Sequence, residues 1–130
     1  MLEDMSSRDF VTQILLGNNP DFHGGNLEGD FTIVGNSGNN KLQVESVDLE
    51  NMDIYGNVRI QNVHFNGDLN FYHACVNGKG NGTVTEFVLE DVIIDGDLSL
   101  PQNLAEMVKD GQRVFIHNVH VKGQIQFCSP

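Results

Sequence analysis

A ten-residue pattern occurs five times in the chain and limits its fold more than any other feature of the sequence. The copies align on a glycine that is followed by two apolar residues spaced two apart, and all but the first open with Asn or Asp. They read GGNLEGDFTI (24–33), NMDIYGNVRI (51–60), NVHFNGDLNF (62–71), DVIIDGDLSL (91–100) and NVHVKGQIQF (118–127). Self-similarity of this kind is typical of repeat architectures.

The spacing of the apolar residues indicates what the repeat builds. Pairs of apolar residues recur at steps of five residues, as from Val58 and Ile60 to Val63 and Phe65, and the step across each glycine is six. A short strand with both apolar side chains inward, followed by a short corner, is the geometry of a chain that winds round a tube. We therefore predict an all-β fold, a short right-handed parallel β-helix of about five coils.

The Asn66-Gly67 pair also fits the turn of a two-residue β-hairpin. In that hairpin Val63 and Phe65 would face one side of the sheet and Leu69 and Phe71 the other, so neither side would be cleanly apolar. A corner of a coil keeps all four apolar side chains inside. We therefore favour the corner over the hairpin.

Glycine and Asn or Asp residues are expected at the corners of the coil. Glycine allows the positive φ that a tight corner needs, and the structural repeat glycines are Gly29, Gly56, Gly67, Gly96 and Gly123. The Asn or Asp that opens a copy is expected to stack on its counterparts in neighbouring coils and to hydrogen-bond to their backbone. These residues are Asn51, Asn62, Asp91 and Asn118.

The 130 residues have the length of one ordinary domain, so we predict a single domain over 1–130. Ser6 and Asp9 offer the signature of a helix N-terminus, and Gly17 is a natural end, which predicts a capping helix over 6–17 that covers the first coil. The β-helix repeats are expected over 20–127, with loops at 34–41, 76–85 and 101–112, the last with a short helix over 104–109.

The last coil differs from the first, because no helix is expected after Phe127. An open terminal coil exposes a sheet edge with an apolar rim, and such an edge pairs readily with another chain. We therefore expect a homo-oligomer that assembles through the C-terminal coil.

Two stretches, NPDFHGGNLEGDF (19–31) and VDLENMDIYGNVRIQNVHF (47–65), resemble the pentapeptide-repeat proteins, whose chains wind into a right-handed four-sided β-helix. The x-Gly-Asp-apolar-x-apolar pattern is similar to the bactofilins, β-helical proteins that polymerise end to end. The extra residue at each glycine also allows a wider or three-sided coil. The resemblance implies a scaffold without an active site, and it also implies a DNA-mimic role, because some pentapeptide-repeat proteins bind DNA gyrase in this way.

The charge of the chain is strongly acidic, with 18 Asp and Glu against 7 Lys and Arg and a formal net charge of −11. This argues against direct binding to nucleic acid and to anionic membranes, and it allows a basic protein partner. The candidate acidic or polar interaction face consists of Asp30, Asn57, Asp68, Glu90, Asp95 and Asp97.

The sequence contains no recognisable catalytic motif. His64 and His120 share one repeat position, but no third ligand follows at a metal-binding spacing, and Cys75 and Cys128 form no CxxC motif. There is also no nucleophile elbow or phosphate-binding glycine loop. We expect no catalytic residue, no bound metal and no cofactor.

The leading hypothesis is thus a non-catalytic structural or protein-interaction module that self-associates. The chain shows no secretion signal and no apolar run of about 20 residues, so a cytoplasmic location is expected. Two alternatives remain open: an acidic, DNA-mimic-like decoy for a basic nucleic-acid-handling protein, and a small carbohydrate- or metal-dependent enzyme.

Overall fold

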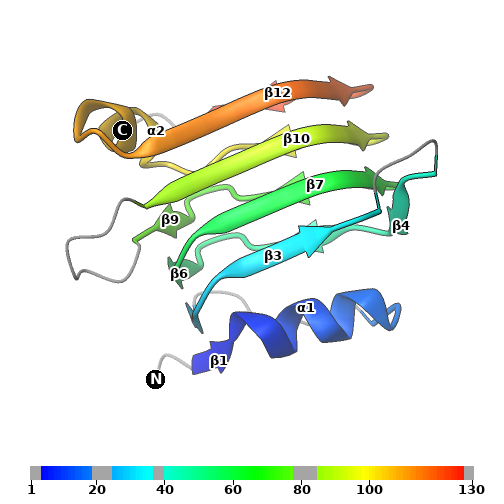
Figure 1. Cartoon of the computed structure of the whole chain (residues 1–130), viewed down its shortest axis with the longest axis horizontal. Helices are drawn as coiled ribbons and strands as arrows, with labels where there is room; N and C mark the ends of the chain where they lie inside the picture. The colour runs from blue at the N-terminus through cyan, green and yellow to red at the C-terminus, as the bar shows by residue number, and fades with distance from the viewer. Residues whose placement is uncertain (1–3, 19–24, 37–39, 78–84, 128–130) are drawn as a thin grey trace.

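The computed structural model describes residues 4–18, 25–36, 40–77 and 85–127. They form a parallel β-solenoid of about three turns, in which three sheets run along the length of the molecule (Figure 1). Every strand pairing is parallel and joins strands of successive turns, as a winding chain requires. The predicted all-β solenoid is confirmed.

The strands of the three sheets alternate along the chain. The first sheet has the order β1 (Asp4–Ser6), β2 (Asn26–Glu28), β6 (Asp53–Tyr55) and β9 (Cys75–Val76). The second has the order β3 (Phe31–Val34), β7 (Val58–Phe65), β10 (Glu86–Ile94) and β12 (Arg113–Val121), and β4 (Leu42–Val44) also pairs with β7. The third has the order β5 (Val47–Asp48), β8 (Leu69–Asn70), β11 (Leu98–Ser99) and β13 (Ile125–Gln126).

The number of turns is smaller than the five coils expected from the repeat. Val47 pairs with Leu69, so the chain returns to the same place after 22 residues. Two ten-residue copies, 51–60 and 62–71, therefore lie in a single turn. Longer turns contain the predicted insertions: Val58 pairs with Phe87 after 29 residues and Leu98 with Ile125 after 27.

The core lies inside the tube and is built from the apolar pairs of the repeat. The turn from 52 to 71 shows the complete set, in which every side chain is fully buried: Met52 and Ile54, Val58 and Ile60, Val63 and Phe65, Leu69 and Phe71. Successive pairs face inward from successive sides of the turn. Each full turn therefore contributes four pairs to one continuous core.

The long strands of the second sheet bend at a residue with positive φ. Asn62, Asp91 and Asn118 have φ values of 56°, 55° and 55°, and they lie at equivalent places in β7, β10 and β12. Asn118 Nδ2 donates to Asp91 Oδ1 at 2.6 Å. Asn and Asp tolerate this conformation better than other non-glycine residues. Asn51, with φ 62°, occupies a different corner.

The repeat glycines stack in two columns. We expected glycine there because of a positive φ, but most of these positions exclude a side chain for lack of space. Only Gly29 has a positive φ, of 96°. A Cβ on Gly56, Gly96 or Gly123 would instead collide with the carbonyl group of the glycine one turn earlier, respectively Gly29, Gly67 and Gly96. Close stacking of the turns at two corners therefore excludes a side chain at these positions.

Two helices interrupt the strands. Helix α1 (Ser7–Leu15) lies across the N-terminal end of the solenoid, and its N-cap Ser6 Oγ accepts a hydrogen bond from the Asp9 N–H at 3.0 Å. Helix α2 (Leu104–Lys109) lies beside β12 at the opposite end (Figure 1). Within the described residues, neither helix has the length or apolar character needed to cross a membrane.

Candidate functional site

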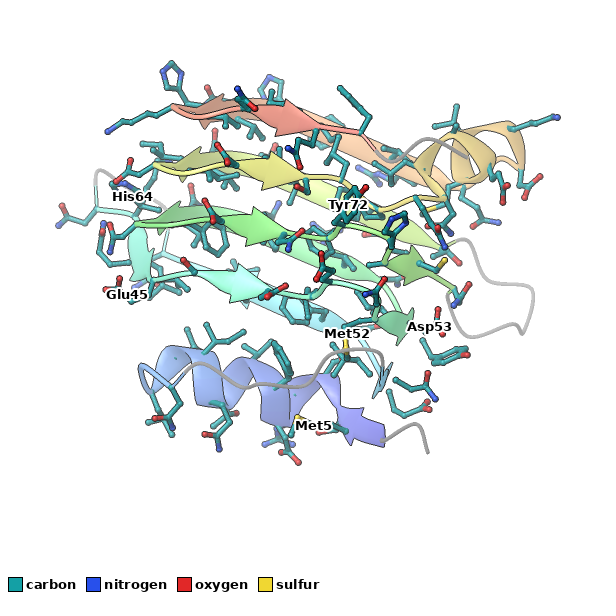
Figure 2. All side chains as sticks on the ribbon, turned by 180° about the vertical axis from the view of Figure 1, so that it is seen from behind. Met5, Glu45, Met52, Asp53, His64 and Tyr72 are labelled. Carbon is teal, nitrogen blue, oxygen red and sulfur yellow. The ribbon has the colours of Figure 1, made fainter. Side chains whose placement is uncertain are left out.

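The N-terminal end of the solenoid is closed by α1. The helix turns Phe10, Val11 and Ile14 toward the first turn, and all three are buried. Ser7 Oγ donates to the Gly29 carbonyl oxygen at 2.8 Å, which fixes the helix to a corner of the first turn. Figure 2 shows α1 lying under the sheets with side chains directed at them. This end therefore presents no open core.

The C-terminal end of the solenoid is open, because β12 and β13 have no strand beyond them among the described residues. Three inward positions of this turn are exposed: Ile116 by 44%, Ile125 by 52% and Phe127 by 73%. Their partners one turn earlier are almost completely buried, namely Leu89, Leu98 and Leu100. The same repeat positions thus change from core to surface.

An open apolar pocket of about 640 Å³ lies at this end. Leu104 and Val108 of α2 line one side, and Ile116 of β12 and Phe127 line the other. Val108 is 62% exposed. Ile116 and Phe127 hold inward positions of the repeat, so the pocket lies between α2 and the exposed apolar side chains of the last turn.

The backbone of β12 also faces outward at this end. The Arg113 N–H donates to Thr85 O, and the Lys122 N–H donates to Ile94 O, so both residues direct their backbone groups toward the preceding turn. Backbone groups alternate between the two edges of a strand. The alternation therefore turns the N–H and C=O groups of Val114, Ile116, Val119 and Val121 toward the open end.

The predicted acidic or polar face is not a single column. Asp30 Oδ1 accepts a hydrogen bond from the Asn57 N–H at 2.9 Å at one corner. At another corner, Asp68 Oδ1 accepts from the Asp97 N–H, and Asp97 Oδ1 accepts from the Gln124 N–H, both at 2.8 Å. These side chains join the backbone of successive turns. These carboxylates therefore stabilise the stacking of one turn on the next.

Glu90 lies within β10 of the second sheet, and Asp95 follows the end of β10, directly before the corner residue Gly96. Glu90 Oε1 accepts from Gln61 Nε2 at 2.7 Å. Asp95 lies between His64 Nε2 and Lys122 Nζ, each 3.0 Å from one carboxylate oxygen. The hydrogen bond from His64, followed by that from Lys122, lowers the pKa of Asp95. The residues of the predicted face thus do not gather at one place.

His64 and His120 occupy equivalent places in their strands, as their shared repeat position predicts. Ile93 pairs with His64 on one side and with His120 on the other, so the two imidazoles are two strands apart (Figure 2 labels His64). In the described part of the chain, no three His, Cys, Asp or Glu side chains are grouped closely enough to hold a metal ion. Cys75 is a free thiol, and Cys128 lies outside the described residues.

The individual residues of the open end were not singled out from the sequence, which indicated only an apolar rim. The signal was nevertheless present. Ile116 and Phe127 occupy repeat positions that hold buried residues one turn earlier, and Phe127 closes the last of the five copies. Val108 gave no such signal, because it belongs to the inserted helix.

The fold and its ends define a short β-solenoid that is closed at one end and open at the other. No family model, curated protein or solved structure matches the chain. The assignment of a role therefore depends on the geometry of the open end and on the distribution of charge.

Proposed function

We propose that this protein is a non-catalytic structural or protein-interaction module that self-associates through its open C-terminal end. The observation that carries the proposal is the contrast between the two ends. Phe10, on the inner side of the capping helix α1, is 1% exposed, whereas Phe127 at the open end is 73% exposed. Exposed strand edges with apolar residues are preferred sites of strand pairing between chains.

The distribution of charge favours a second copy as the partner. Residues 1–100 contain 16 acidic and 4 basic side chains, for a formal charge of −12. Residues 101–130 contain 2 acidic and 3 basic side chains, for a formal charge of +1. Two copies that approach through their acidic bodies repel each other, and two copies that approach through the open ends do so least.

The acidic decoy is the second candidate, and the −12 charge of residues 1–100 is the observation in its favour. Three of its candidate carboxylates, on Asp30, Asp68 and Asp97, accept hydrogen bonds from backbone N–H groups of the next turn. Their role within the fold accounts for their presence without a partner. This makes the decoy the weaker of the two candidates.

The finer description of the fold belongs to the same proposal. We infer a right-handed winding, because parallel crossover connections are right-handed in nearly all proteins. Four inward apolar pairs in each turn and stacked corners support a relation to pentapeptide-repeat or bactofilin-like β-helices. We also propose that the protein is located in the cytoplasm.

Light scattering across a hundredfold range of protein concentration tests the proposed function. We expect the average mass to rise from 14.4 kDa toward twice that value, and to do so equally in low and high salt, because apolar and backbone contacts resist screening. Ile125→Lys should keep the protein monomeric. Leu16→Lys, which makes the same change at an exposed residue of the closed end, should not. A monomer at every concentration would refute the proposal.

A further inference from the structure

We propose that two copies join as a symmetric dimer in which β12 pairs with β12 of the second copy in antiparallel orientation. In this arrangement Val114 faces Val121 of the partner subunit, and Ile116 faces Val119 of the partner subunit. The inference rests on the proposed self-association and adds to it the surface, the symmetry and the register. It follows from the backbone, the side chains and the charge of the last turn.

The backbone of β12 is complementary to itself. The residues that direct their N–H and C=O groups to the open end are Val114, Ile116, Val119 and Val121, as the bonds of Arg113 and Lys122 to the preceding turn require. A twofold axis between positions 117 and 118 places each of these residues opposite another member of the same set. The backbone N–H and C=O groups of these four residues of β12 then all have a partner.

The side chains agree with the same register. Val114, Ile116, Val119 and Val121 continue the inward columns of Phe87, Leu89, Val92 and Ile94. A twofold axis perpendicular to the second sheet keeps the inner face of the sheet on the same side in both copies. The apolar interiors of the two solenoids then become continuous, and the half-buried valines and exposed Ile116 become core. The bend at Asn118 lies next to the axis, so the bends of the two strands lie side by side.

The dimer is closed, because the other end of each copy is capped. Helix α1 covers the first turn, and its side chains Phe10 and Ile14 are buried against that turn. An isologous contact uses the same surface on both copies and leaves no free surface of the same kind. The structure therefore points to a dimer and not to a filament.

The size of the open end sets the expected strength. β12 has nine residues, and a strand of that length spans about 30 Å at about 3.3 Å per residue. With opposite sheets about 10 Å apart and side chains on both outer faces, each end presents on the order of 600 Å², so a dimer buries about 1,200 Å². This is the lower limit of specific interfaces. We expect dissociation on dilution through the micromolar range.

One contact in this register is unfavourable and provides a test. Arg113 faces Lys122 of the partner subunit, and like charges directly opposite each other weaken a strand pair. Asp95, at 3.0 Å from Lys122 Nζ in the same copy, offsets part of this repulsion. Arg113→Glu replaces the repulsion by an attraction and should tighten the dimer about five- to tenfold. Lys109→Glu makes the same change of charge on α2 and should give no such gain.

Cysteine cross-linking tests the register directly. In a background in which Cys75 and Cys128 are replaced by Ser, the double variant Phe115→Cys/His120→Cys places its two thiols at directly opposite positions of the proposed dimer. Such pairs have Cα atoms about 4.5 Å apart, within the range of a disulfide. The control Arg113→Cys/Phe115→Cys carries two outward thiols on the same strand, and in the proposed register neither thiol lies near a thiol of the other copy. Circular dichroism of both variants reports whether they fold.

The proposal expects the 115/120 variant to oxidise to a covalent dimer and the 113/115 variant to remain uncross-linked between copies. A dimeric mass with equal cross-linking of both variants, or with none, would overturn the register and leave the proposed function standing. The Arg113→Glu variant tests the same register without cysteines, since no tightening relative to Lys109→Glu contradicts it. A protein that stays monomeric, or one in which an added apolar peptide occupies the edge while no dimer forms, would overturn both the register and the proposed function.

Discussion

Replacing Gly96 tests the physical account of the corners. The φ of Gly96 is not positive, so no left-handed backbone conformation requires glycine at this position. A Cβ at this position would come within 2.8 Å of the Gly67 carbonyl oxygen and would collide with Asp68 Oδ1. We therefore predict that Gly96→Asn destabilises the protein for a steric reason alone.

The size of the effect follows from what must move. Overpacking against backbone that cannot yield typically costs about 1–3 kcal/mol. Asp68 Oδ1 also accepts the Asp97 N–H at 2.8 Å, and loss of that hydrogen bond adds about 1 kcal/mol. We expect the free energy of unfolding to fall by about 2–4 kcal/mol, a large part of the roughly 5–15 kcal/mol of an ordinary domain.

Gly111→Asn is the matched control for the Gly96 variant. Gly111 follows α2 with φ 80°, and no atom lies within 4 Å of the position of a Cβ there. Asn accepts this conformation, as Asn62 and Asn118 already do in this chain. Urea unfolding followed by circular dichroism should therefore show a change of only a few tenths of a kcal/mol for Gly111→Asn. If Gly96→Asn is equally harmless, the steric argument for the corners is wrong.

Two further predictions concern the cap and the outer face. Phe10→Ala empties a buried site between α1 and the first turn and should lower the free energy of unfolding by about 3–5 kcal/mol, whereas Leu16→Ala at an exposed site should change it by less than about 0.5 kcal/mol. If Phe10→Ala and Leu16→Ala unfold at the same urea concentration, α1 does not act as a cap. Because the pKa of Asp95 is lowered in the fold, its stabilisation is present above the ordinary carboxyl pKa of about 3.9 and is lost as the pH falls through the lower, folded value. The melting temperature of Asp95→Asn should thus lie below that of the wild type near neutral pH and converge with it in acid, and a constant difference would contradict this.

The solenoid was predictable because its core residues follow a short-range pattern in the sequence. Pairs such as Val63 and Phe65 need only the period of a strand and the length of a corner to be recognised, and these are short-range properties. The first helix was equally visible in Ser6 and Asp9, since capping involves residues three apart. Burial and capping follow from neighbouring residues, so a sequence shows them.

The number of turns was not predictable in the same way. The ten-residue copy describes half a turn, because two corners of each turn face the same steric demand from the turn before. Gly56 stacks on Gly29 at one corner, and Gly96 stacks on Gly67 at the other. Both corners therefore select the same pattern, and the sequence alone does not distinguish one corner from the other.

The candidate site was less visible for a related reason. Asp30 and Asn57 are 27 residues apart, and Asp68 and Asp97 are 29 apart, yet each pair is joined by a hydrogen bond. The register that joins them depends on the lengths of the insertions, which no local pattern contains. Lys122 was not expected beside Asp95 for the same reason.

Amide hydrogen exchange of β12 at two protein concentrations tests the central claim most directly. In dilute solution, the amides of Val114, Ile116, Val119 and Val121 face the open end and should exchange rapidly, whereas those of β10 between two strands should be protected. At a concentration a hundredfold higher, we predict that exchange in β12 slows and that exchange in β10 is unchanged. Exchange in β12 that is equally fast at both concentrations would show that the open end remains free, and would contradict self-association through β12.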